Sequence, residues 1–183
     1  MLDSSISYRV IQAREKGKYG KFYYIFYTDF GQYLSKESIV FILSIMPIIE
    51  LRGGLIAASL LKIPYVQALC LAIIGNILPI PFVLFFFSKL VLFLESFSYT
   101  KPIANWFRKK VDANRESVEK YDFWGLALFV GIPLPGTGAW TGAMVASLLK
   151  MDRKKSLLSI LLGILLASCI MSLISYGLLA KLL

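Results

Sequence analysis

The sequence predicts an all-α integral membrane protein of two inverted repeats, each a re-entrant helical hairpin followed by a transmembrane helix, with interfacial amphipathic helices beside them. Three observations support this class: an apolar composition, an internal duplication, and apolar segments too short to cross a bilayer. The chain is 57% hydrophobic with a mean hydropathy of +0.69. Residues 156–180 contain no charge, which is typical of a membrane-spanning helix.

The duplication is visible in the pentapeptide ASLLK, which begins at Ala58 and, 88 residues later, at Ala146. The residues around both copies stay in register without gaps. Paired prolines and glycines are informative because they interrupt or bend the backbone rather than merely fill a core. The matched pairs are Phe41 with Phe129, Pro47 with Pro135, Gly54 with Gly142, Leu69 with Leu157, Gly75 with Gly163, and Leu78 with Leu166.

The N-terminal leader, residues 1–37, differs from the rest of the chain. It is polar up to Lys21 and then has six aromatic residues within positions 22–30. Aromatic side chains at this density favour the headgroup zone of a membrane. An interfacial amphipathic helix is therefore favoured over a true crossing for residues 22–37, and no cleavable signal peptide is expected.

The length of each apolar segment decides how it meets the bilayer, because a crossing helix needs about 20 residues. The segments flanking the charged cluster at Glu50 and the PLPGTG stretch are shorter than this, so each is interpreted as half of a re-entrant hairpin. Repeat 1 is expected at 38–94, with a hairpin at 38–62 and a transmembrane helix at 65–94; repeat 2 is expected at 123–183, with a hairpin at 123–150 and a transmembrane helix at 156–180.

A polar connector, residues 95–122, joins the repeats and carries six basic residues and five acids. Trp106, Phe107, Val111 and Val118 are loosely spaced as one helical face, which predicts an amphipathic helix. Two interpretations stay open: a helix on the membrane surface, or an ordinary solvated helix. The connector and residues 150–155 together hold ten basic residues, against six in the leader, so the positive-inside rule places the connector on the cytoplasmic side.

Glu50 and Arg52 are the strongest site candidates, because a charge at mid-membrane costs several kcal/mol and is seldom kept without a partner or a task. They are close enough in sequence to form a buried ion pair that pins the first hairpin. Their counterparts 88 residues later are Gly138 and Trp140, so the second hairpin needs no charge.

A functional alternative is an anion site at the centre of the membrane. Half-helices that begin near Gly53 and Gly138 would direct free N–H groups toward the midplane, where Arg52 adds a cation. Glu50 is expected to carry protons. The remaining substrate-binding candidates are Asn76, which either satisfies carbonyl groups freed by nearby prolines or lines the path, and the turn residues Pro135, Gly136 and Thr137.

Three stretches carry a resemblance to known proteins: IIELRGG from Ile48, GNILPIP from Gly75, and ALFVGIPLPGTGAWTGA from Ala127. They resemble the small multidrug export protein family and, more distantly, the DedA or VTT membrane proteins, over residues 38–183. The resemblance implies paired re-entrant hairpins and a role in transport or lipid translocation. DedA relatives are linked to undecaprenyl phosphate or phospholipid, but this chain lacks the second acidic or Arg-bearing tip motif of DedA proteins.

The sequence therefore predicts a transporter or flippase for an anionic or amphipathic substrate, such as a lipid phosphate, in the inner (cytoplasmic) membrane. The alternative is a proton-coupled exporter of small cationic drugs. An enzyme is not expected, because no histidine is present and no nucleophile–base arrangement is apparent. Cys70 and Cys169 lie in apolar runs, and neither a metal nor a cofactor is expected. The expected partners are membrane lipids and a second copy of the chain, not nucleic acid.

Overall fold

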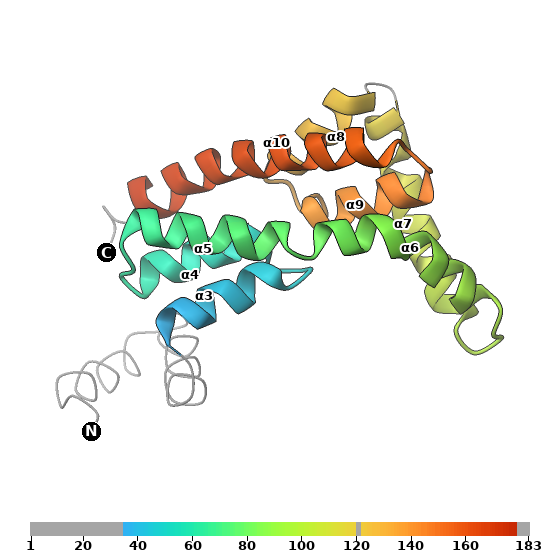
Figure 1. Ribbon diagram of the computed structural model, residues 1–183, viewed down its shortest axis with the longest axis horizontal. Helices are drawn as coiled ribbons and strands as arrows, with labels where there is room; N and C mark the ends of the chain where they lie inside the picture. The colour runs from blue at the N-terminus through green and yellow to red at the C-terminus, as the bar shows by residue number, and fades with distance from the viewer. Residues whose placement is uncertain (1–34, 120–121, 179–183) are drawn as a thin grey trace. The chain divides into compact units, whose positions relative to one another are not determined.

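A computed structural model describes residues 35–119 and 122–178, and all of its regular elements are helical (Figure 1). The all-α prediction is confirmed for these residues. The chain divides into two compact units, Met1–Ile39 and Val40–Leu183. The predicted leader lies almost entirely outside the described residues. The helices are α3 (Lys36–Ile45), α4 (Glu50–Leu60), α5 (Tyr65–Ile77), α6 (Ile80–Glu95), α7 (Lys101–Glu119), α8 (Asp122–Gly131), α9 (Ala139–Leu148), α10 (Arg153–Ser172) and the π-helical turn η2 (Leu173–Leu178).

Within the part of the chain that the structure describes, two helical stretches are long and apolar enough to cross a bilayer, as the sequence predicts: Tyr65–Glu95 and Arg153–Gly177. The first is broken between α5 and α6, where Pro79 caps α6 and Pro81 lies in its first turn. Proline has no backbone N–H, so the α-helical hydrogen bonds are interrupted at this point. The second stretch runs through α10 into η2 without a proline.

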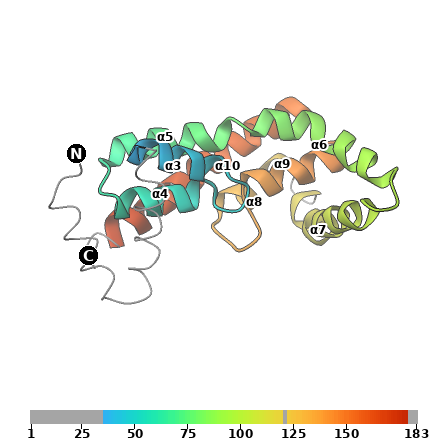
Figure 2. The ribbon, with the colours of Figure 1, turned by 90° about the horizontal axis from the view of Figure 1, so that it is seen from below.

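The two long stretches lie side by side and run in opposite directions (Figures 1 and 2). At one end, the rings of Tyr65 and Tyr176 meet edge to face with centroids 5.3 Å apart. At the other end, the guanidinium carbon of Arg153 lies 4.9 Å from the ring centroid of Phe85. The first stretch therefore begins beside the end of the second, and the second begins beside the middle of α6.

Each long stretch packs against a short helix at a glycine. A Cβ at Gly75 would lie 2.9 Å from the carbonyl oxygen of Phe41 in α3, and one at Gly163 would lie 2.7 Å from that of Ala127 in α8. Such distances exclude a side chain, so both glycines permit close helix packing. Phe41 and Ala127 are 86 residues apart, whereas the two glycines are 88 apart. The ungapped pairing of Phe41 with Phe129 is thus not the equivalence seen in the packing, because the connection after α8 is longer.

The ASLLK copies form the same turn in both halves. Lys62 and Lys150 each have φ +55°. The N–H of Ile63 donates to the carbonyl of Ala58, and the N–H of Met151 donates to that of Ala146, both at 3.0 Å. The duplication read from the sequence is therefore repeated in backbone geometry at these positions.

Helix α7 forms most of the predicted connector and packs against α6, α8 and α9. The ring of Phe107 meets that of Phe87 edge to face, with centroids 5.1 Å apart. Arg108 binds the Glu95 carboxylate at the end of α6, with Nη2 3.0 Å from Oε2. This hydrogen bond raises the pKa of Arg108 above its ordinary value.

Candidate functional site

Glu50 binds the N-terminus of α9, in the other half of the chain. Its Oε1 accepts a hydrogen bond from the N–H of Trp140 at 3.0 Å, and its Oε2 accepts one from the N–H of Ala139 at 3.3 Å. The side chain is 5% exposed. The first N–H groups of a helix lack partners within the helix and carry partial positive charge, so a carboxylate is well placed there.

Gly138 makes this contact possible. A Cβ at this position would lie 2.1 Å from Oε2 of Glu50, and the residue has φ +143°. Both the close approach and the backbone angle require glycine. Glu50, its counterpart 88 residues earlier, also has a positive φ, of +53°. For a residue with a side chain this conformation costs about 1 kcal/mol, which the bonds to α9 offset.

Arg52 binds the broken backbone that follows α8. Two prolines in the connection 132–138 prevent a helix, so several carbonyl groups there have no helical N–H partner. The two terminal nitrogens of the guanidinium donate to them at 2.9–3.2 Å. The acceptors are the carbonyls of Val130, Ile132, Leu134 and Thr137 and the hydroxyl of Thr137.

The exchange between the two halves is reciprocal. The indole N–H of Trp140 donates to the carbonyl of Ile45, the last residue of α3, at 3.0 Å. Trp140 is the counterpart of Arg52 at an offset of 88 residues. The second helix of each pair, α4 or α9, therefore carries at the same position a side chain that donates to the carbonyl end of the first helix of the other pair, α8 or α3. We refer to Glu50, Arg52, Gly138 and Trp140 as the exchange cluster.

Most of the donors predicted to bind an external anion have other partners in this structure. The N–H groups at the start of α9 bind the carboxylate of Glu50. The N–H of Gly53 donates to Ile49, and that of Thr137 donates to Leu134. Gly136, with φ +83°, and Pro135 form an exposed turn. An external anion at the start of α9 would therefore have to displace Glu50.

Thr137 stabilises the turn itself. Its hydroxyl oxygen lies 3.0 Å from the carbonyl oxygen of Ile132 and 2.9 Å from that of Leu134, so its one proton serves either acceptor. The same oxygen accepts the bond from Arg52. Arg52 thus binds the connection 132–138 itself, whereas Glu50 binds the start of the helix that follows it. Both residues therefore bind the second half of the chain.

Asn76 lies in the last turn of α5 and is 3% exposed. Among the described residues, no hydrogen-bond donor reaches its Oδ1. Its counterpart 88 residues later is the buried Ile164. A buried amide oxygen without a partner is costly, so the polarity of Asn76 is not explained by packing.

A cavity of about 720 Å³, which the sequence analysis missed, borders the exchange cluster at Trp140. We call it the aromatic cavity. It lies among α6, α7, α9 and the connection before α4. Its lining comprises Pro47, Ile48, Phe82, Val83, Phe86, Phe87, Lys89, Leu90, Phe93, Trp106, Phe107, Lys110, Trp140, Thr141 and Met144. The sequence does contain a signal for this cavity, because Phe82, Phe86 and Phe93 recur at helical spacing on α6. The structure shows that these rings are exposed, so burial in the protein core does not account for them.

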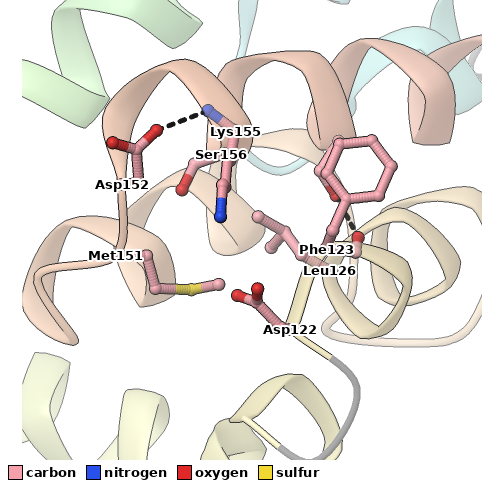
Figure 3. Close-up of a pocket in the computed structure, with 8 residues that line it drawn as sticks. Asp122, Phe123, Leu126, Met151, Asp152, Lys155 and Ser156 are labelled. Carbon is pink, nitrogen blue, oxygen red and sulfur yellow. Dashed lines mark hydrogen bonds between the residues drawn. The ribbon is translucent and has the colours of Figure 1, made fainter.

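A second, much smaller pocket lies between α8 and the start of α10 (Figure 3). Its volume of about 10 Å³ accommodates at most one water molecule. Asp152 caps α10 by accepting from the N–H of Lys155 at 2.9 Å, and the hydroxyl of Ser159 donates to the carbonyl of Phe123. The groups around this pocket therefore stabilise the helix ends.

Comparison with known families identifies the chain. The family model described as "Putative small multi-drug export protein" matches residues 50–170, from Glu50 to beyond the middle of α10. The chain belongs to this family. The match includes the whole exchange cluster and most of the aromatic cavity. Together with the two long apolar helices, family membership establishes a membrane protein. No curated protein and no solved structure matches the chain significantly.

Proposed function

We propose that this member of the small multi-drug export family is a multi-pass transporter of the cytoplasmic membrane. Its substrate is amphipathic, and α3–α4 and α8–α9 are re-entrant hairpins that enter from opposite faces. The family description supports export, and the antiparallel course of the two long helices supports the inverted arrangement. The short helices have 10 or 11 residues, or about 15 Å at 1.5 Å per residue, half the thickness of the hydrocarbon core.

The exchange cluster is the observation that carries the proposal. It holds the ends of the four short helices together through bonds that cross between the two halves. Separation of the hairpins would break the bonds of Glu50, Arg52 and Trp140 at once. Such a set of bonds is suited to a gate with two states, because packed interfaces change between discrete arrangements rather than continuously.

Glu50 is the group through which protons would act on this gate. A carboxylate binds the positive end of α9 better than a neutral carboxyl group does. Protonation would therefore weaken the contact between the halves, while Arg52 would keep its charge. This order of events would couple opening to proton uptake.

A second candidate is a proton-coupled exporter of small cationic drugs, which the family description favours. In that case Glu50, once released from α9, would give up its proton and bind the cation as a carboxylate, so that proton and cation bind in turn. The two candidates differ in the charge of the substrate but share the gate.

Transport by purified protein in liposomes tests both. A fluorescent lipid phosphate and a fluorescent cationic dye are followed with and without a pH gradient, in the wild type, Glu50→Gln and Arg52→Lys. Glu95→Gln is the matched control, because it removes a partly exposed carboxylate that binds an arginine outside the cluster. We expect Glu50→Gln to abolish the response to the pH gradient, Arg52→Lys to slow transport about tenfold or more, and Glu95→Gln to behave as the wild type. Wild-type rates in both cluster variants would refute the gate.

A further inference from the structure

We propose that the aromatic cavity is the substrate site and that it binds an amphiphile with one anionic headgroup, such as an alkyl phosphate. This inference deepens the proposed function by assigning its substrate class and site. The cavity volume of about 720 Å³ lies within the range of roughly 300–1,000 Å³ typical of small-molecule sites.

The walls of the cavity fit the apolar part of such a molecule. Phe82 and Phe93 on α6 are 67% and 61% exposed, and Trp106 on α7 is 56% exposed. Met144 on α9 adds a flexible thioether, which adapts to ligands of different shape. Exposed rings on a membrane-crossing helix face lipid chains by default, so the binding surface is marked by the hollow that these rings share with α7 and α9, not by their exposure.

The charge of the cavity selects the headgroup. Lys89 and Lys110 are the charged residues of the lining, and both are positive. The ammonium of Lys89 lies 6.0 Å from the ring centroid of Phe86, and that of Lys110 lies 5.2 Å from the ring centroid of Trp106. The cations therefore stand beside the aromatic walls, where a phosphate can bind them while its chain lies on the rings. A cationic headgroup would be repelled by both lysines.

The cavity also reaches the gate. Trp140 lines it through its side chain, and the N–H of the same residue binds Glu50. Thr141, the next residue of α9, is part of the lining as well. A bound chain would thus contact the first turn of the helix that the exchange cluster holds, which links occupancy of the site to the position of α9.

Tryptophan fluorescence tests the site without any transport step. Trp106 and Trp140 line the cavity, whereas Trp124 lies on α8 outside the lining and is replaced by Phe in all proteins tested. The Trp124→Phe protein is placed in phosphatidylcholine nanodiscs. It is then titrated with three amphiphiles that share one brominated alkyl chain, which quenches tryptophan on contact, and differ in a phosphate, phosphocholine or trimethylammonium headgroup.

We expect half-quenching by the phosphate at a concentration about tenfold below that of the trimethylammonium compound. Lys89→Gln and Lys110→Gln should each raise the half-quenching concentration of the phosphate about fivefold, since each removes one attractive charge. Lys109→Gln is the matched control: it removes an exposed lysine next to Lys110 that does not line the cavity, and it should change nothing.

Equal quenching by all three headgroups would overturn the proposal, because the cavity would then hold any acyl chain of the bilayer. Absence of quenching together with a dimeric mass in light scattering would also overturn it, because a second copy of the chain would cover the cavity. The outcomes for the gate are separate. Binding without transport would refute the proposed function alone, and transport without headgroup-selective binding would refute this inference alone.

Discussion

The two pairs of short helices share one plan but differ in the segment that joins each pair. Between α3 and α4 the connection is short and is followed at once by Glu50 and Arg52. Between α8 and α9 it is longer, contains two prolines, and has no charge. The charged residues of the first pair bind the broken backbone of the second. The comparison shows why only the first pair of helices carries charged residues: Glu50 and Arg52 bind the unpaired backbone N–H and carbonyl groups at the helix ends of the second pair.

The largest expected effect comes from filling the contact between the pairs. Gly138→Ala places a Cβ 2.1 Å from Oε2 of Glu50, at a backbone angle that side chains rarely adopt. We expect a loss of about 3 kcal/mol or more in the free energy of unfolding. Thermal unfolding of the purified protein in mild detergent measures it.

Gly136→Ala is the control for that substitution. Gly136 also has a positive φ, but a Cβ there would meet no atom within 4 Å. The cost should be limited to backbone strain, about 1 kcal/mol. Equal losses at the two positions would mean that the contact with Glu50 contributes nothing.

The next effect compares the two donors that occupy equivalent positions. Arg52→Lys removes a planar donor group that serves five acceptors and should cost about 2–3 kcal/mol, because a lysine cannot reach them together. Trp140→Phe removes a single hydrogen bond to Ile45 and should cost about 1 kcal/mol. Chemical unfolding of both variants measures the difference. A larger loss for Trp140→Phe would show that packing of the indole, not its N–H, dominates.

Much of the fold was predictable, because hydropathy and helix breakers determine it locally. The two long apolar stretches, the break at Pro79 and the equivalence of Lys62 with Lys150 all follow from residues close in sequence. The offset of 86 between α3 and α8 was not predictable, since it depends on how the prolines at 133 and 135 turn the chain. Ungapped matching of letters cannot detect a shift made within a connection.

Glu50 and Arg52 were identified because charge is rare in an apolar chain, but their partners were not. A charged side chain can be stabilised by an oppositely charged residue, by an external ion or by the end of a helix. The sequence does not distinguish these partners, because the choice depends on which groups lie nearby in the fold. In the sequence Trp140 appears only as the uncharged counterpart of Arg52 at an offset of 88, which does not indicate a shared task. The indole N–H shows that equivalent positions can perform one task with different chemistry.

The two long helices differ at a pair of equivalent buried positions, which is occupied by Asn76 in the first half and by Ile164 in the second. Asn76→Ile gives the first half the residue that the second half has at Ile164. Removal of the unpaired buried Oδ1 should raise the free energy of unfolding by about 1 kcal/mol. We expect transport to fall in the same variant. The buried amide of Asn76 lowers stability and occurs in the first half alone, so a role in transport accounts for it better than packing does. A loss of stability would instead show that Oδ1 has a partner such as a bound water.

The smallest effect comes from two serines that lie one turn apart on α10 and line the small pocket, Ser156 (Figure 3) and Ser159. Ser159 donates to the carbonyl of Phe123, so Ser159→Ala should cost about 1 kcal/mol. The hydroxyl of Ser156 is buried without a partner among the described residues, and its counterpart in the first half is the buried Ala68. Ser156→Ala should therefore be neutral or stabilise by up to about 0.5 kcal/mol, because the desolvation of an unpaired hydroxyl is removed. Unfolding of the two variants side by side measures a difference that does not depend on absolute stability. An equal loss in the free energy of unfolding for Ser156→Ala and Ser159→Ala would show that the small pocket holds a water bound to Ser156. The second half would then use a polar contact at the position where the first half has only the packed side chain of Ala68.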